Sequence, residues 1–271
     1  MDFGMPTLVE NSTLDDNVRL CKELGLQFVE LNMNFPQYQI ESLEQTATYL
    51  EIMKREGIYF TIHLDENLNV ADFNHAVANA YMDTVRRAIA VAHEIHAPIL
   101  NMHMNHGIYL TLPDRKVQMY EEYFDIYMEA MERFIQMCDS EIGEDDIRIS
   151  VENTDGFFDF EKRAIERMLQ SPRFSLTWDI GHSHATQNVD EDFLMAHEDR
   201  LRHFHIHDAK GKQNHLALGT GEIDLPQRLA LAEKHNCRCV VETKTIAALR
   251  ESQGRFFCGG EYPAIMKMPS I

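Results

Sequence analysis

The feature that most constrains this chain is an alternation of short extended runs with longer helical runs over nearly its whole length. The extended runs are rich in β-branched and aromatic residues, and helical spacing of apolar residues follows nearly every one. Parallel strands need long crossover connections, so this alternation predicts a parallel sheet covered by helices. The predicted strands are 3–7, 27–32, 58–63, 99–104, 147–152, 174–179, 202–207 and 239–242. Eight such units predict an α/β fold, a single (β/α)8 TIM barrel.

The helical segments show one apolar face each, and no linker or low-complexity stretch interrupts them. About 250 residues is a usual length for one α/β barrel, so we expect one domain over residues 1–271. The first helix is expected to begin after a capping Ser12 or Thr13. Further helices are expected around 123–134 and over 42–55, 75–95, 160–169, 191–200 and 226–234.

Polar and apolar residues alternate strictly within several predicted strands. In 147–152, 174–179 and 58–63 the apolar residues hold one parity, and Ser, Thr and a final ionisable residue hold the other. Because strand side chains alternate between the two faces, the apolar set would meet the helices and the polar set would face the barrel axis. An antiparallel sheet with one solvated face would alternate similarly, but it would not require a helix after nearly every strand.

Ionisable residues occupy the inward position at the carboxyl end of seven predicted strands. A barrel gathers these ends around one opening, where barrel enzymes carry their chemistry. Several buried carboxylates need a neutralising charge, and a divalent cation supplies it most simply. Mixed imidazole and carboxylate ligands suit Zn, Mn, Fe or Co, whereas a closed structural zinc site would use thiolates. The seven residues are Glu30, His63, His103, Glu152, Asp179, His205 and Glu242, with Glu30 equally consistent with a solvated or structural role.

The charge and the cysteines bear on partners and location. The chain has 44 acidic and 25 basic residues, a formal net charge of −19, which disfavours binding to nucleic acid or anionic membranes by bulk charge. No run is long and apolar enough to span a membrane. Five cysteines without framework spacing and an N-terminus without a signal-peptide pattern predict a reduced, cytoplasmic protein.

Short motifs in four strand-end segments, and one in the loop after the seventh strand, resemble the xylose isomerase-like barrels, the superfamily of sugar isomerases, epimerases and the endonuclease IV type of apurinic endonuclease. The resemblance extends over roughly residues 3–242. Each motif is short, but their order along the chain is specific for the superfamily. The matching segments are Val-Glu-Asn-Thr-Asp-Gly at 151–156, Trp-Asp-Ile-Gly-His at 178–182, His-Ile-His-Asp at 205–208, Leu-Gly-Thr-Gly at 218–221 and Val-Glu-Thr at 241–243.

The resemblance implies different metal counts in its two branches. The epimerase-like branch implies one divalent ion on Glu152, Asp179, His205 and Glu242, with His182 near the substrate. The endonuclease-like branch implies three zinc ions, with further ligands that match His63, His103, His182, an Asp and His215. At the position of that Asp the chain has Gln213. We therefore expect one or two ions, of Zn, Mn, Co or Mg.

These residues predict a metal-dependent isomerase or epimerase of a sugar or sugar phosphate. A cation between Glu152 and Glu242 would polarise a carbonyl and stabilise the enediolate formed when the two glutamates move the α-proton. His182 would hold a hydroxyl or the developing oxyanion. Loss of a β-hydroxyl after the same step would instead give a dehydratase of a keto-polyol.

Two further alternatives remain at this point. The first is an endonuclease IV-like phosphodiesterase acting on abasic DNA, against which stand the net charge and the acidic segment 64–69 that follows His63. The second is a barrel that binds a ligand without catalysis. Asn153, His207 and Lys210 are expected to contact substrate. Aromatic residues in the tail 254–271, namely Phe256, Phe257 and Tyr262, would pack either on the barrel or on a neighbouring subunit of a homo-oligomer.

Overall fold

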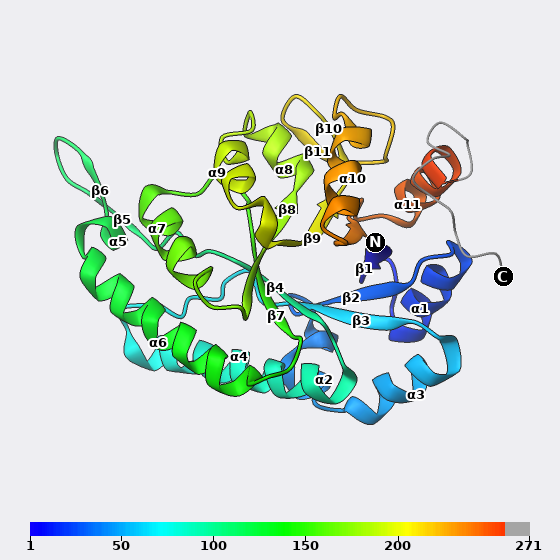
Figure 1. Ribbon diagram of the computed structural model, residues 1–271, viewed down its shortest axis with the longest axis horizontal. Helices are drawn as coiled ribbons and strands as arrows, with labels where there is room; N and C mark the ends of the chain where they lie inside the picture. Colours follow the sequence, from blue (N-terminus) through cyan, green and yellow to red (C-terminus); the bar gives the residue numbers. More distant parts are fainter. Residues whose placement is uncertain (258–271) are drawn as a thin grey trace.

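The structure is a computed structural model that describes residues 1–257, and within them eight parallel strands close into a barrel (Figure 1). Each strand pairs with the next, and the first pairs with the last through Phe3 and Cys239. The predicted fold is therefore confirmed. In order around the barrel the strands are β1 (Asp2–Pro6), β2 (Phe28–Asn32), β3 (Tyr59–His63), β4 (Ile99–His103), β7 (Arg148–Glu152), β8 (Phe174–Asp179), β9 (Leu201–Ile206) and β12 (Arg238–Val241).

Helices follow every barrel strand and cover its outside. The first helix begins at Leu14 and is capped by Thr13, whose side chain accepts a hydrogen bond from the N–H of Asp16. Of the two capping residues that the sequence offered, the structure therefore uses Thr13. The helices are α1 (Leu14–Glu23), α2 (Ile40–Leu43), α3 (Thr46–Glu56), α4 (His75–Ile95), α5 (Met119–Glu122), α6 (Phe124–Ile142), α7 (Asp159–Met168), α8 (Ile180–Ala185), α9 (Glu191–Ala196), α10 (Leu225–Lys234) and α11 (Ile246–Ser252).

The strands confirm the predicted alternation between outward apolar and inward polar residues. Val29, Leu31 and Ile62 are fully buried against the helices, while Thr61 and Thr177 fill the barrel interior with hydroxyl groups. Inward hydroxyls bond to one another and to other inward polar groups, since buried polar groups need partners. This polar interior lies directly beneath the carboxyl ends of the strands and supports the residues gathered there.

Two hairpins were not predicted from the sequence. They are formed by β5 (Tyr109–Thr111) with β6 (Lys116–Gln118) and by β10 (Asp208–Lys210) with β11 (Gln213–Leu216). Both follow barrel strands, and the first projects beyond α5 and α7 as the green arm in Figure 1. Their strands have three or four residues, too few for an alternation of polar and apolar residues to be recognised.

Two predicted helices are interrupted in the structure. The segment 42–55 divides into the end of α2 and most of α3, and 191–200 divides into α9 and a 3-10 turn over Glu198–Arg200. In each case a short tight turn replaces continuous helix, which single-sequence patterns resolve poorly.

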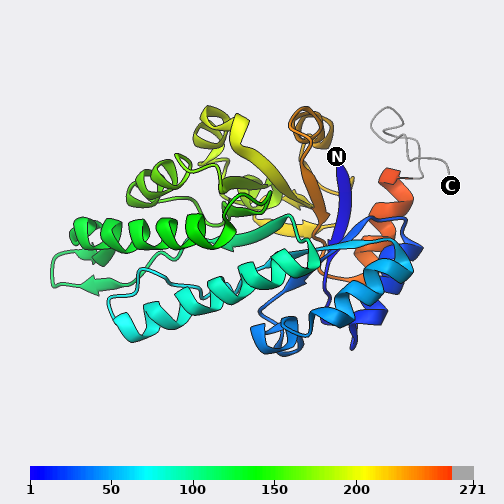
Figure 2. The ribbon, with the colours of Figure 1, turned by 60° about the horizontal axis from the view of Figure 1, so that its bottom comes forward.

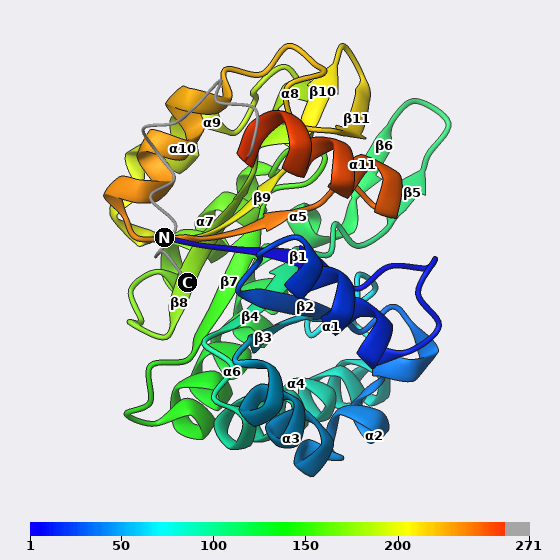
Figure 3. The same cartoon turned by 90° about the vertical axis from the view of Figure 1, so that its right-hand side faces the viewer.

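The two ends of the barrel meet where it closes. Helices α1 and α11 lie side by side in Figure 2 and are joined by an ion pair of 2.9 Å between Glu23 and Arg250. Figure 3 shows β1 entering the barrel between these two parts of the chain. The side chains of Phe256 and Phe257, and Tyr262, lie outside the described residues, so their packing and the extent of the domain to residue 271 stay predictions. Among residues 1–257 no helix is long and apolar enough to cross a membrane.

Candidate metal centre

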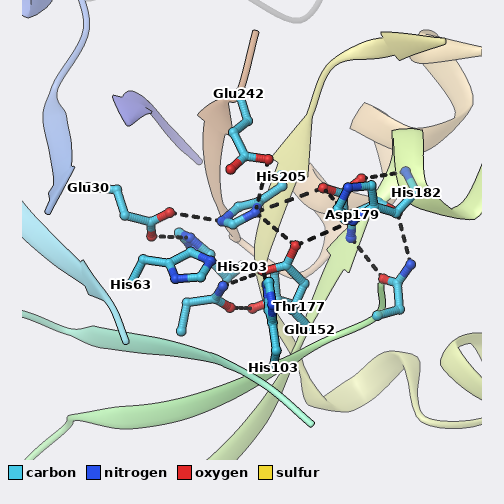
Figure 4. Close-up of polar contacts among 12 residues, drawn as sticks. Glu30, His63, His103, Glu152, Thr177, Asp179, His182, His203, His205 and Glu242 are labelled. Atoms are coloured by element: carbon cyan, nitrogen blue, oxygen red, sulfur yellow. Dashed lines mark hydrogen bonds and ion pairs between the residues drawn. The ribbon is translucent and has the colours of Figure 1, made fainter. Parts of the chain in front are cut away.

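His205 lies at the centre of the strand-end cluster and is fully buried on β9 (Figure 4). Its Nδ1 atom is 3.1 Å from Glu152 Oε1, 3.5 Å from Glu242 Oε2 and 3.9 Å from Asp179 Oδ2. These four side chains come from the ends of β7, β8, β9 and β12. The structure thus brings together the four residues that the sequence proposed as metal ligands.

Burial and charge are strongly opposed in this cluster. The four side chains are at most 3 % exposed. Burial alone would raise the pKa of Glu152, but the charges of His205 and His103 hold it well below its usual value. Burial would likewise lower the pKa of His205, yet Glu152, Glu242 and Glu30 raise it well above the ordinary value. Among these four side chains three carboxylates face one imidazole, an arrangement that favours a cation.

Asp179 is held in place on every side. It caps α8, where Oδ1 accepts the N–H of His182 at 2.7 Å. Its backbone N–H and carbonyl both bond to the side-chain amide of Asn153, at 2.9 and 3.0 Å. His207 places Nε2 3.0 Å from Oδ1. Asn153 and His207 are both buried and bonded to the protein, and their predicted contact with substrate stays a prediction.

A second group surrounds the other oxygen of Glu152. His63 Nε2 lies 3.5 Å and His103 Nε2 3.1 Å from Glu152 Oε2, which also accepts a hydrogen bond from Asn101. His63 Nδ1 lies 2.8 Å from the carbonyl oxygen of Leu64, which can only accept, so Nδ1 carries the ring proton. Nε2 is therefore the ring nitrogen that His63 could offer to a second cation, and it faces Glu152.

A further group of three histidines, His182, His207 and His215, is less suited to bind an ion of its own. His182 directs Nδ1 toward Asp179 at 3.5 Å and Glu152 at 3.9 Å, and this buried atom has no hydrogen-bond partner. His182, His207 and His215 lie close enough to share an ion. However, His207 Nδ1 accepts the backbone N–H of His215 at 2.8 Å while Nε2 contacts Asp179, so both ring nitrogens of His207 are already engaged. We therefore expect His182 to act together with the main cluster, which is formed by Glu152, Asp179, His205 and Glu242.

Glu30 requires a correction. The sequence placed it with the strand-end residues, but β2 continues to Asn32, which pairs with His63, while Glu30 pairs with Thr61. Glu30 therefore lies one layer deeper, beneath His205, and contacts His203 and His205 at 2.9 Å each. The end of the strand at Asn32 was predicted correctly, but the ionisable Glu30 was taken as its last inward residue although Asn32 has the same parity and lies nearer the opening.

A cavity of about 530 Å³ opens above the cluster. Several of its walls come from loops after β3, β4 and β7, which were missed from the sequence although their position after strand ends was the available signal. The predicted Lys210 is exposed on β10 and is not among the lining residues. Those residues are His63, Glu66, Asn67, His103, Met104, Asn105, His106, Glu152, Thr154, Asp155, His182, His215, Glu242 and Lys244.

Lys244 is the one lysine or arginine among the lining residues, and its Nζ atom lies 2.6 Å from Glu242 Oε1. Burial raises the pKa of Glu242, but Lys244 and His205 together lower it below its usual value. Oε1 is thus paired with a cation while Oε2 faces His205. The carboxylate is fixed in orientation and stays ionised at neutral pH.

Residues 18–256, which are most of the chain, match the sequence pattern of the xylose isomerase-like TIM barrel family. The chain belongs to this family. An uncharacterized protein of Methanocaldococcus jannaschii is 25% identical over 182 residues, which cover 65% of this chain and 66% of that protein. This chain therefore matches slightly under two thirds of that relative.

Solved structures with the same fold include a D-tagatose 3-epimerase-like protein, with a TM-score of 0.73, 20% identity and coverage of 94% of this chain and 95% of the other. An IolI protein with a bound zinc atom has a TM-score of 0.67 and 15% identity, with coverage of 94% of this chain and 96% of the other. A probable 3-DHS dehydratase of Bacillus anthracis has a TM-score of 0.71 and 10% identity, with coverage of 95% of this chain and 99% of the other. At these identities the likeness establishes the fold.

The residues of the main cluster fit a divalent cation. They offer one imidazole nitrogen and carboxylate oxygens from three strands, a donor set that suits Zn or Mn. Asp179, His205 and Glu242 present ligand atoms within 4.8 Å of one another, as do Glu152, Asp179 and His182. The orphaned Nδ1 of His182 points into the same space.

Proposed function

We propose that this protein is a divalent-metal-dependent isomerase or epimerase of a sugar, which works by α-proton transfer. The observation that carries the proposal is the meeting of Glu152, Asp179 and Glu242 around Nδ1 of His205 beneath an open cavity. The sugar epimerases among proteins of the same fold support it, as does the zinc-bound protein. We propose Zn, Mn, Co or Mg, as one or two ions.

The two glutamates suit proton transfer because they approach the same space from different strands. Glu152 and Glu242 end β7 and follow β12, so a sugar lying between them presents opposite faces to the two carboxylates. A cation bound at the cluster supplies Lewis-acid polarisation of the substrate carbonyl. One glutamate then removes the α-proton and the other returns a proton on the opposite face or at the neighbouring carbon. His182 would hold the hydroxyl or the developing oxyanion.

The charges around the cavity favour an unphosphorylated sugar over a sugar phosphate. Glu66 and Asp155 line the cavity in addition to the two glutamates, while the one lining lysine, Lys244, is already paired with Glu242. A phosphate would therefore approach carboxylates without an unpaired lysine or arginine among the lining residues to receive it. Neutral hydroxyl groups can bond to these carboxylates at no such cost.

A dehydratase of a keto-polyol is the second candidate function, supported by the dehydratase of the same fold. It shares the first step, the removal of an α-proton, and differs in the loss of a β-hydroxyl afterwards. Incubation of the metal-loaded protein with a panel of ketoses, analysed by mass spectrometry and chromatography, separates the two. A product of unchanged mass supports the epimerase or isomerase, and a product that has lost one water supports the dehydratase.

Metal binding is expected to stabilise the folded protein and to occur at one or two ions per chain. The cation offsets the repulsion among Glu152, Asp179 and Glu242, and a ligand at about 100 times its Kd adds about 2.7 kcal/mol of stability. Thermal unfolding of chelator-treated protein, before and after addition of Zn²⁺ or Mn²⁺, measures the gain. Elemental analysis of the reloaded protein gives the stoichiometry. Three bound ions, or an unchanged unfolding temperature with every metal, would contradict the proposal.

We expect no cleavage of abasic DNA by the zinc-loaded protein. Phosphodiester hydrolysis by clamped metal ions needs a surface that accepts a phosphate backbone. Here Glu66 and Asp155 lie at the cavity, and the chain has a net charge of −19. A labelled duplex with one abasic site, incubated at low salt and resolved by gel electrophoresis, tests this. Metal-dependent incision at that site would overturn the sugar-based proposal in favour of the endonuclease alternative.

A further inference from the structure

Glu30 is a carboxylate enclosed within the barrel, and the proposed proton transfer does not use it. It is 1 % exposed and lies beside His205 (Figure 4), one layer below the strand ends. Its two oxygens lie 2.9 Å from His203 Nε2 and 2.9 Å from His205 Nε2. A buried ionised carboxylate is costly unless it is paired, so its partners indicate its role.

The two oxygens of Glu30 have different surroundings. Oε2 accepts a hydrogen bond from the hydroxyl of Thr61 at 3.0 Å and lies 2.9 Å from His203 Nε2. These two partners anchor the carboxylate from β3 and β9. Oε1 has no hydrogen bond, and it lies 2.9 Å from His205 Nε2, which has none either.

His203 contacts Glu30 through one ring nitrogen, Nε2. Its Nδ1 is buried without a partner, and the proton therefore sits on Nε2, where it meets Glu30 Oε2. Glu30 Oε1 is left to face His205, through Nε2.

The opposite nitrogen of His205 faces the proposed metal ligands. In the metal-free protein Nδ1 forms a hydrogen bond of 3.1 Å with Glu152 and lies 3.5 Å from Glu242, while Nε2 faces Glu30, so a cation at this place would take the position of a proton on Nδ1. A histidine can bind a cation through Nδ1 only if that atom has no proton, and the ring must then keep its proton on Nε2. A carboxylate behind the ring fixes this arrangement and increases the basicity of the ligating nitrogen.

We propose that Glu30 is a positioning residue that keeps the ring proton of His205 on Nε2 and so leaves Nδ1 free to bind the divalent cation. This inference rests on the proposed metal-dependent function. It assigns Glu30 no contact with substrate, because the residue lies one layer below the cavity and is not among the residues that line it.

The test compares zinc affinity in Glu30→Gln and in a matched control. Glutamine keeps the shape of the side chain, but its amide can donate to Nε2 and thus favours a proton on Nδ1, the wrong arrangement. We expect the Kd for Zn²⁺, measured by competition with a chromogenic chelator, to increase about 10- to 100-fold. Glu161→Gln is the control. Glu161 is equally buried and its Oε1 lies 2.8 Å from Nδ1 of a histidine, His106, but neither residue belongs to the proposed metal ligands. Its Kd should stay within about threefold of wild type.

A spectroscopic measurement on the wild-type protein keeps the inference testable even if Glu30→Gln fails to fold. Long-range proton–nitrogen NMR of the zinc-loaded protein should show His205 protonated at Nε2 and zinc-bound at Nδ1. The reverse arrangement, or a Glu30→Gln variant that binds zinc as tightly as wild type, would overturn the role of Glu30 alone. A wild-type protein that binds no divalent metal would instead overturn the proposed function and this inference with it.

Discussion

Replacement of Glu152 or Glu242 by glutamine is expected to abolish turnover while the barrel stays folded. Each substitution removes a charge from the candidate metal ligands and a group able to accept a proton. General acid–base catalysis alone contributes about 10²- to 10⁴-fold, so a loss of at least about a thousandfold is expected when metal binding is weakened as well. Glutamine keeps the volume of the buried side chain, and Asn101 and His103 can still contact position 152.

The measurement is exchange of the substrate α-proton with solvent deuterium, followed by NMR in the metal-loaded protein with a ketose that the wild type converts. Both variants should show no exchange above background. Glu161→Gln should exchange as the wild type does, because Glu161 caps the start of α7 and pairs with His106 rather than with the cluster. Near-normal exchange in either Glu152→Gln or Glu242→Gln would refute the proton-transfer mechanism.

The fold could be predicted because two independent regularities agree. Alternation within strands such as 147–152 fixes which side chains face inward, and the helices between strands fix that the sheet is parallel. Together they place Glu152, Asp179, His205 and Glu242 at one opening although they lie far apart in the sequence. The structure brings these four together around a single ring nitrogen.

Depth and partnership could not be predicted in the same way. The layer that Glu30 occupies depends on strand pairing, which sets Glu30 beside Thr61 and not beside His63. The roles of Asn153 and His207 depend on contacts with Asp179 between different strands, for which the sequence contains no periodic signal. Loop residues such as Asp155 line the cavity because of loop conformation, which local patterns do not determine.

Replacement of Gly181 by alanine is expected to have the largest effect on stability. A Cβ atom at this position would lie 1.9 Å from Cε1 of His207 and 2.1 Å from its Nδ1, so the ring would have to move. His207 would then lose its contact with Asp179 and the hydrogen bond from the N–H of His215. Overpacking and the loss of buried hydrogen bonds together cost about 2 to 5 kcal/mol.

Denaturant unfolding of the metal-free protein measures this cost, and two further variants identify its cause. Gly254→Ala is the matched control, because a Cβ there meets no atom within 4 Å, and its stability should stay within about 1 kcal/mol of wild type. In a His207→Ala background the clashing ring is gone, so adding Gly181→Ala should cost little more. If Gly181→Ala lowers the free energy of unfolding as much in the His207→Ala background as in the wild type, the clash with the His207 ring is not the reason why glycine is needed at this position.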